Sequence, residues 1–307
     1  MRLAVLGAGG VGGYFGARLA AAGTEVSFVA RGAHAAAMRS GGLRIESPKG
    51  DLHLPKVAVV ERVQDLPDSD VVLNCVKLWD LEESGRLLAA GATRGALVVP
   101  IQNGVESSEI LRRHLPAERV AAGIAYISAE IAAPGLIRHV GPFARLNFGA
   151  LLPAQRPVLE ALVEACHRAK VEAGVSDDIR RDLWGKFIML QALAGATASR
   201  RTTVGALRDS EEGSALLLGL VREAVALGRA EGVALPDDAE TTAWATLARM
   251  PPAMRASMAL DLERGNRLEL SWLNGYVARR SAEHGLDAPL SSGVVAELGR
   301  HAEGARR

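Results

Sequence analysis

Short apolar runs alternate with amphipathic stretches through the first half of the chain. Apolar runs of about 4–8 residues bounded by turn-forming residues are typical of strands, and apolar residues at helical spacing predict helices. The expected strands cover residues 3–6, 26–30, 57–60, 70–76 and 97–101. The expected helices cover residues 12–22, 33–40, 81–90 and 105–114. Strands that alternate with helices in this way predict a parallel sheet in an α/β fold.

The pattern changes in the middle of the chain. Further runs of strand character occur at residues 120–129, 135–140 and 145–148, and turn signals separate them. We expect these runs to add strands to the first domain. From residue 155 onward helical periodicity dominates. The sequence therefore predicts an α/β domain over residues 1–174 and an all-helical domain over residues 175–307.

Composition and charge narrow the class of protein. The chain has 307 residues, of which 49% are hydrophobic, so it can bury a sizeable core. Its 36 basic and 35 acidic side chains are spread evenly, and neither a nucleic acid nor a membrane is an expected partner. The two cysteines, Cys75 and Cys166, lie in apolar segments, which predicts a reducing, cytoplasmic location. The histidines lack metal-ligand spacing, so no metal is expected, and the Leu- and Ala-rich helical half is compatible with a homodimer.

A glycine-rich loop joins the first predicted strand to the first predicted helix. It has the pattern G-x-G-x-x-G and comprises Gly7, Ala8, Gly9, Gly10, Val11 and Gly12. Such glycines allow a tight turn, close approach of a pyrophosphate to the backbone, and close packing of the helix on the strand. The alternative is a glycine-rich turn without a ligand. The position of the loop favours a Rossmann-type dinucleotide-binding domain that is followed by the helical domain.

The ends of later strands carry candidate ligand-binding residues. An NAD site usually has an acidic residue after the second strand, whereas this chain has Arg31 there, which suits a 2′-phosphate and predicts NADPH. The alternative for Arg31 is a solvated loop arginine. Lys77 and Asn103 follow two further strands and are expected at the same edge of the sheet. The alternative for Lys77 is a surface cation at the end of a strand, and the alternative for Asn103 is a turn-forming residue.

Lys186 is the single charged residue in the apolar stretch 183–199. Most basic residues of this chain are arginines, so a lysine in an apolar setting is notable. Burial would lower the pKa of Lys186 and make it a plausible proton donor. The alternatives are a pair with Asp182 or an ammonium that reaches solvent from a helix end.

Glu269 is also the single charge in its segment, residues 268–278. A capping box formed with Asn266 would explain this acid without any function. Ser257 lies on the preceding predicted helix, one turn before Asp261. It would either bind substrate or hydrogen-bond its own backbone.

Several motifs occur in a characteristic order and spacing: VLGAGGVGGYFG, NCVKLWD, IQNGV, GLIRHVG, LWGKF, and SMALDLERGNRLELSWLNG followed by HGLDAP. Through them nearly the whole chain resembles the ketopantoate reductase (2-dehydropantoate 2-reductase) family. The resemblance implies a Rossmann domain with a helical domain, and NADPH-dependent reduction of a 2-oxo acid, either 2-dehydropantoate to pantoate or a related, more apolar 2-oxo acid. The implied cofactor contacts are the glycine loop, Arg31, Lys77, Asn103, Ala129 and Glu269.

The resemblance also implies roles for the reaction itself. Lys186 matches the catalytic lysine, which protonates the carbonyl oxygen as a hydride reaches the adjacent carbon. Glu269 matches the acid that contacts the cofactor ribose and the substrate hydroxyl. Asn103 would lie near the nicotinamide and help to position the reacting group, and Ser257 matches a contact of the substrate carboxylate.

The chain departs from the family pattern around the substrate. Family members usually carry asparagines where this chain has Leu190, Ala194 and Val204. The loss of these amides predicts a more apolar pocket and a changed preference among 2-oxo acids. Arg200 or Arg201 would hold a substrate carboxylate or lie on the surface. Two other functions remain open: a catalytically silent NADP-binding or redox-sensing protein, and a reductase of imines or of 3-hydroxy acids.

Overall fold

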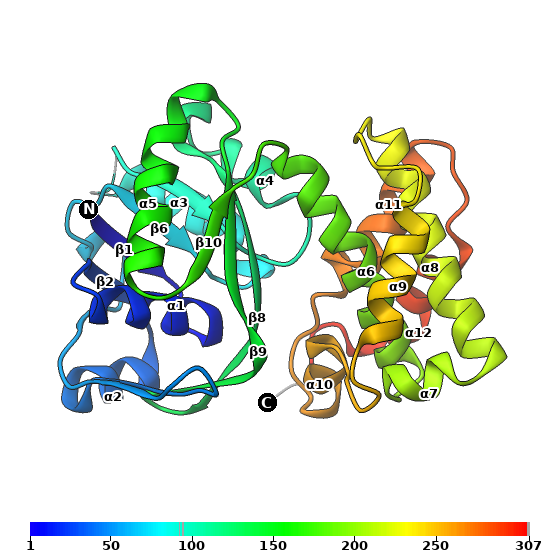
Figure 1. Cartoon of the computed structure of the whole chain (residues 1–307), viewed down its shortest axis with the longest axis horizontal. Helices are drawn as coiled ribbons and strands as arrows, with labels where there is room; N and C mark the ends of the chain where they lie inside the picture. The colour runs from blue at the N-terminus through cyan, green and yellow to red at the C-terminus, as the bar shows by residue number, and fades with distance from the viewer. Residues whose placement is uncertain (92, 94, 306–307) are drawn as a thin grey trace. The chain divides into compact units, whose positions relative to one another are not determined.

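The computed structural model describes residues 1–91, 93 and 95–305, and the chain divides into two compact units (Figure 1). The first unit comprises Met1–Gln102 and Glu106–Ile179, and the second comprises Asn103–Val105 and Arg180–Arg307. The predicted fold class, a Rossmann-type α/β domain with a helical domain, is confirmed. The boundary predicted after residue 174 falls inside strand β10 (Glu172–Val175), which pairs with a strand of the first unit.

A five-stranded parallel sheet forms the centre of the first unit. Its strands are β1 (Arg2–Leu6), β2 (Glu25–Val29), β5 (Ala58–Val60), β6 (Val71–Asn74) and β7 (Leu97–Pro100). β6 and β7 are buried along their whole length, as expected for strands covered on both faces. The order across the sheet is β5-β2-β1-β6-β7, so the winding direction reverses at β1. Open α/β sheets bind ligands beyond the carboxyl ends of the strands at such a reversal.

Helices and short 3₁₀ turns lie between the strands of the first unit. The helices of the first unit are α1 (Gly10–Ala21), α2 (Gly32–Gly41), α3 (Leu81–Ala90), α4 (Ser107–Arg112) and α5 (Arg156–Arg168). The 3₁₀ turns are η1 (Val63–Asp65), η2 (Leu78–Asp80), η3 (Ala117–Arg119) and η4 (Pro153–Gln155). The apolar faces of α1 and α5 share one core with the sheet, which includes Phe15, Phe28 and Leu162.

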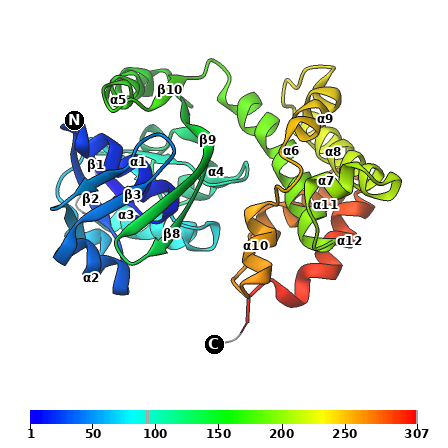
Figure 2. The ribbon, with the colours of Figure 1, turned by 60° about the horizontal axis from the view of Figure 1, so that its bottom comes forward.

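A second sheet belongs to the same unit. It contains β3 (Leu43–Glu46), β4 (Leu52–Leu54), β8 (Ala122–Ala133), β9 (Leu136–Gly149) and β10. β8 and β9 form a long antiparallel hairpin (Figure 2). The strands expected at residues 135–140 and 145–148 are therefore one strand, because its irregularity at residues 141–143 bends the ladder without ending it. The expectation that these runs add strands to the first unit is confirmed.

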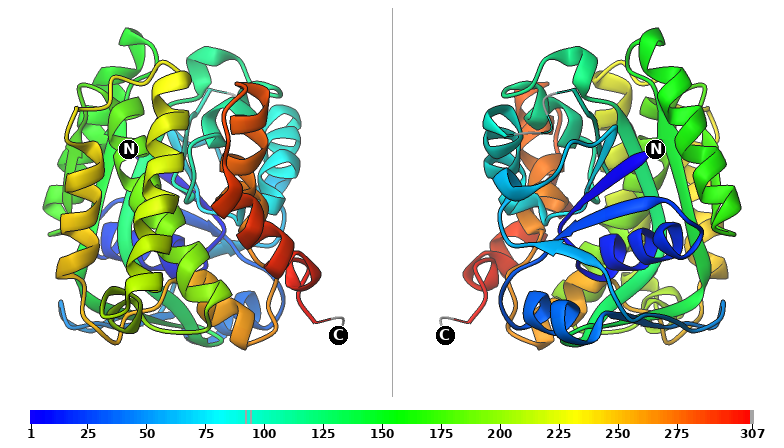
Figure 3. Two further views of the ribbon diagram at one scale, coloured as in Figure 1. Left: turned by 90° about the vertical axis from the view of Figure 1, so that its right-hand side faces the viewer. Right: turned by 90° about the vertical axis from the view of Figure 1, so that its left-hand side faces the viewer.

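The second unit is helical (Figure 3). Its helices are α6 (Ile179–Ser199), α7 (Val204–Arg208), α8 (Glu211–Ala230), α9 (Ala239–Arg249), α10 (Ser257–Glu263), α11 (Asn274–Glu283) and α12 (Pro289–Leu298), with 3₁₀ turns η5 (Leu270–Trp272) and η6 (Gly299–His301). α6 packs on α11 partly through Trp184, Phe187 and Tyr276, whose rings meet edge to face. None of the helices in the described part of the chain is long and apolar enough to cross a bilayer.

Candidate active site

The predicted glycine loop is the turn between β1 and α1. Gly7 has a φ of +94°, in the left-handed region that favours glycine. A Cβ on Gly12 would lie 2.3 Å from the carbonyl oxygen of Gly7, so the turn itself requires both glycines. A Cβ on Gly9 would meet no described atom within 4 Å beyond its chain neighbours. The loop is therefore open at Gly9, where a ligand can approach the backbone.

The backbone N–H groups of the loop fall into two sets. Those of Gly7 and Ala8 donate to the carbonyl oxygen of Val29, at 3.2 and 3.0 Å. The N–H groups of Gly10–Gly12 lie in the first turn of α1 and have no acceptor within the helix. A helix N-terminus behind an open glycine fits the pyrophosphate of a dinucleotide.

Strand β8 lies against the start of α1. A Cβ on Gly10 would lie 2.0 Å from the carbonyl oxygen of Ala129, a distance that only a glycine avoids. Ala129, which the family resemblance implied as a cofactor contact, thus adjoins the glycine loop.

Two cations follow the strands that flank β1. Arg31 comes after β2 and is the N-cap residue of α2, and its side chain is exposed. Lys77 comes after β6, is also exposed, and has its Nζ 5.5 Å from the ring centroid of Trp79. A helix N-terminus attracts anions, so Arg31 and α2 favour negative charge at the same place.

Lys186 and Asn103 lie together in the second unit. Lys186 is on α6, and Asn103 belongs to the segment Asn103–Val105, which groups with this unit although it lies between strands and helices of the other. The Nζ atom of Lys186 donates a hydrogen bond of 3.0 Å to Oδ1 of Asn103. The structure thus brings together two candidate residues that are far apart in the sequence.

The protonation of Lys186 is tuned by its surroundings. The residue is only partly buried by area, but desolvation lowers its pKa to about 8, while the charge of Glu269 acts in the opposite direction. A lysine with this pKa is mostly protonated at neutral pH and gives up its proton more readily than an exposed lysine.

Glu269 is 7% exposed and immediately precedes η5. The capping-box alternative for this acid is wrong, because residues 267–269 are not helical and Glu269 is itself the N-cap residue of η5. The Nδ2 atom of Asn266 instead donates a 3.0 Å hydrogen bond to Oδ1 of Asp261. In the structure Glu269 is a buried carboxylate whose charge raises the pKa of Lys186.

Ser257 is the exposed first residue of α10. The N-cap residue of this helix is Ala256, and no side chain caps it. Within residues 1–91, 93 and 95–305, the Ser257 hydroxyl makes no hydrogen bond. Self-capping does not account for Ser257, and its hydroxyl is accessible to a ligand.

The three positions that lack the family's asparagines differ in their surroundings. Leu190 is partly buried one turn after Lys186, whereas Ala194 and Val204 are 1% and 0% exposed in the core of the second unit. Of these three positions only Leu190 is accessible, so the predicted apolar change affects the accessible surface there and not at Ala194 or Val204. Arg200 is exposed and pairs with Glu212 and Glu297, and Arg201 is exposed with a φ of 48°.

Sequence reasoning missed the role of Gln102, which precedes Asn103. Its Nε2 atom donates to the carbonyl oxygens of Asn74 and Val76, at 2.9 and 3.0 Å. The side chain therefore ties the end of β7 to the end of β6, from which Lys77 follows. The sequence signal was weak: a single amide after a buried strand.

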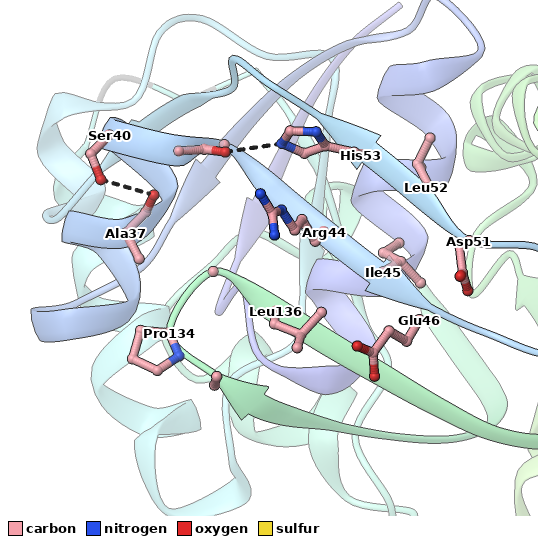
Figure 4. A pocket seen from close by; sticks show the side chains of 14 residues that line it. Ala37, Ser40, Arg44, Ile45, Glu46, Asp51, Leu52, His53, Pro134 and Leu136 are labelled. Atoms are coloured by element: carbon pink, nitrogen blue, oxygen red, sulfur yellow. Dashed lines mark hydrogen bonds between the residues drawn. The ribbon is translucent and has the colours of Figure 1, made fainter.

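A further cavity lies on the first unit, with a volume of about 650 Å³ (Figure 4). It is open, and it is bounded by the end of α2, the β3–β4 hairpin and the turn between β8 and β9. Arg44, Glu46, Asp51 and His53 are among its polar lining residues. None of the predicted site residues lines it.

A parallel sheet with a glycine loop at its winding reversal, in a chain that also has a helical unit, is typical of dinucleotide-dependent oxidoreductases. Two family models match the chain: "Ketopantoate reductase PanE/ApbA" over residues 3–153, and the C-terminal model of the same family over residues 178–302. The chain belongs to the ketopantoate reductase PanE/ApbA family.

Individual relatives agree with this assignment. The 2-dehydropantoate 2-reductase of Caulobacter vibrioides is 30% identical, over 96% of this chain and 97% of its own. The crystal structure of a PanE/ApbA family ketopantoate reductase from Ralstonia eutropha is 33% identical, with a TM-score of 0.90 over 98% of each chain. A D-mandelate dehydrogenase solved with NADH and anilino(oxo)acetate has a TM-score of 0.89 over 98% of each chain, but at 18% identity it shows only a shared fold.

Proposed function

We propose that this protein is an NADPH-dependent reductase of a 2-oxo acid in which Lys186 is the general acid. The observation that carries the proposal is the hydrogen bond from Lys186 to Asn103, together with a lysine pKa lowered to about 8. A lysine in this state suits proton donation to a carbonyl oxygen near neutral pH. The 2-dehydropantoate 2-reductase name of the Caulobacter relative supports the same type of reaction.

Each residue then has a defined task. NADPH, held by the glycine loop, Arg31 and Lys77, would supply a hydride to the carbonyl carbon. Lys186 donates an ammonium proton to the carbonyl oxygen, so the ketone becomes an alcohol and the lysine becomes neutral. Asn103 accepts one hydrogen bond from the ammonium group and thereby orients its other N–H groups. Glu269 raises the pKa of Lys186 and keeps it protonated before the reaction.

The preference for NADPH rests on charge. Arg31 is exposed at the N-terminus of α2, and Lys77 is exposed after the strand on the other side of β1. A guanidinium supported by a helix N-terminus suits a phosphate, whereas an NAD site would offer a carboxylate to the ribose hydroxyls.

The proposed substrate class rests on two accessible residues of the second unit, Ser257 and Leu190. The accessible hydroxyl of Ser257 is suited to a substrate carboxylate. Leu190 offers an apolar side chain one turn after Lys186, where the family usually has an amide. An amide that binds a substrate hydroxyl discriminates strongly, and a leucine does not. We therefore propose a 2-oxo acid with an apolar branch as the preferred substrate, with 2-dehydropantoate as the second candidate.

NADPH oxidation by the purified full chain tests this function. Ketopantoate is compared with apolar-branched 2-oxo acids at matched concentrations, for the wild type, Lys186→Ala and the exposed control Lys56→Ala. We expect Lys186→Ala to abolish turnover while the Kd for NADPH stays unchanged, and Lys56→Ala to behave as the wild type. Tight NADPH binding without turnover of any 2-oxo acid would favour the silent, redox-sensing alternative. Loss of NADPH affinity in Lys186→Ala would contradict the role of the lysine.

A further inference from the structure

His34 joins two segments of the first unit that are distant in the sequence. It lies on the first turns of α2, three residues after Arg31. Its Nε2 atom is 2.9 Å from the carbonyl oxygen of Ala8 in the glycine loop. Its Nδ1 atom is 3.1 Å from the backbone nitrogen of Gly135, in the turn between β8 and β9. One imidazole thus contacts the glycine loop and the hairpin whose Ala129 adjoins that loop.

The partners of the ring determine its tautomer. The N–H group of Gly135 is a donor, so Nδ1 of His34 accepts and carries no hydrogen. The hydrogen of the neutral ring is therefore on Nε2, which donates to Ala8. Burial lowers the pKa of His34, which keeps the ring in this neutral form. The two hydrogen bonds are consistent with each other only for this single tautomer.

Ala8 is held through both of its backbone polar groups. Its N–H donates to the carbonyl oxygen of Val29 at 3.0 Å, and its carbonyl accepts from His34. Val29 ends β2, and His34 lies just beyond the start of α2. Arg31 therefore lies in the chain between the two residues that hydrogen-bond to Ala8. The position of Arg31 relative to the glycine loop therefore depends on both hydrogen bonds.

We infer that His34 is a positioning residue that holds Arg31 at a set distance from the glycine loop, and that it thereby determines the preference for a 2′-phosphorylated dinucleotide. The inference rests on the proposed NADPH specificity. The glycine loop would hold the pyrophosphate and Arg31 the 2′-phosphate, so one rigid ligand spans both groups. NADH lacks the 2′-phosphate, and its binding depends less on where Arg31 lies.

Dissociation constants for NADPH and NADH, measured on the full chain by nicotinamide fluorescence, test this inference. A net hydrogen bond is worth about a factor of five in an equilibrium constant. We expect His34→Ala to reduce the ratio of NADH Kd to NADPH Kd by about fivefold, mainly through weaker NADPH binding. His34→Gln, which keeps a donor near the Nε2 position, should retain more of the ratio than His34→Asn, which keeps an acceptor near Nδ1.

His167→Ala is the matched control, because His167 is an exposed histidine of the same unit with one hydrogen bond, to the carbonyl oxygen of Ala173 at 2.9 Å. We expect it to keep the wild-type ratio. A purely structural role of His34 would lower the active fraction and leave the ratio unchanged, and that result would overturn the inference. If His34→Ala fails to fold, the comparison of His34→Gln with His34→Asn decides. A wild type that does not prefer NADPH would overturn the cofactor proposal and the inference with it. A ratio of NADH Kd to NADPH Kd that stays at the wild-type value in all three His34 variants would overturn the inference alone.

Discussion

Replacing Lys186 by methionine should make the protein more stable and inactive at the same time. Methionine keeps much of the length of the side chain and removes its charge. Burial lowers the pKa of Lys186 from 10.5 to about 8. This difference of about 2.5 units means that keeping the lysine charged in the folded protein costs up to about 3 kcal/mol below its folded pKa. The unpaired Oδ1 of Asn103 in the variant costs about 1 kcal/mol. We therefore expect Lys186→Met to raise the free energy of unfolding by about 2 kcal/mol at about pH 7.

The pH dependence has a definite sign. The unfolded chain binds the lysine proton more tightly than the folded protein, so wild-type stability rises as the pH increases from about 8 toward 10.5. Between about pH 7 and about pH 9.5 the free energy of unfolding of the wild type should rise by about 2 kcal/mol relative to that of the variant, so the two proteins become about equally stable.

Urea unfolding followed by tryptophan fluorescence measures this difference. Three of the 4 tryptophans, Trp184, Trp244 and Trp272, lie in the second unit, so the signal reports mainly on the unit that holds Lys186. Lys56→Met, at an exposed lysine, is the control and should leave stability unchanged at both pH values. A variant that is less stable than the wild type at about pH 7, or a gap that does not vary with pH, would refute the reasoning that Lys186 is a desolvated, charged lysine.

Three further predictions concern candidate residues in each of the two units. Glu269→Gln removes the charge that raises the pKa of Lys186, so the alkaline limb of the pH–kcat profile should move to lower pH; a limb that stays in place would contradict this. Gly10→Ala should destabilise the fold by more than about 2 kcal/mol, because its Cβ would meet a backbone carbonyl, whereas Gly9→Ala should keep the wild-type Tm and weaken NADPH binding. Equal Tm values for the two glycine variants would contradict the geometry of the loop. Leu190→Asn should raise kcat/KM for ketopantoate relative to apolar 2-oxo acids by about tenfold, and an unchanged ratio would mean that Leu190 does not contact substrate.

Local features of the sequence determined much of the first unit. The periodicity of apolar residues predicted β1, α1, β2 and α2 to within about two residues, because strand and helix periods depend on the immediate neighbours of each residue. The glycine loop was equally local, since a positive φ at Gly7 and the close approach at Gly12 are requirements of one turn. The prediction that one strand ends near residue 141 and another begins was wrong, because it too used only local neighbours. Turn-forming residues there predicted an end, but β9 pairs with β8 on both sides of them.

The contacts that make a site depended on the tertiary structure. Lys186 and Asn103 are 83 positions apart, and their hydrogen bond exists because Asn103–Val105 groups with the helical unit, which no local pattern indicated. The sequence singled out Leu190, Ala194 and Val204 together, but packing separates them: one is partly accessible and two are in the core.

His34 shows the same division most clearly. In the sequence it was one of 7 scattered histidines without metal-ligand spacing, and its partners are 26 and 101 positions away. Residue types and their spacing thus determined the fold class, the glycine loop and the charge that suits a 2′-phosphate. Only the tertiary structure decided which distant side chains meet, because burial, tautomer and pKa depend on neighbours that the chain brings together by folding.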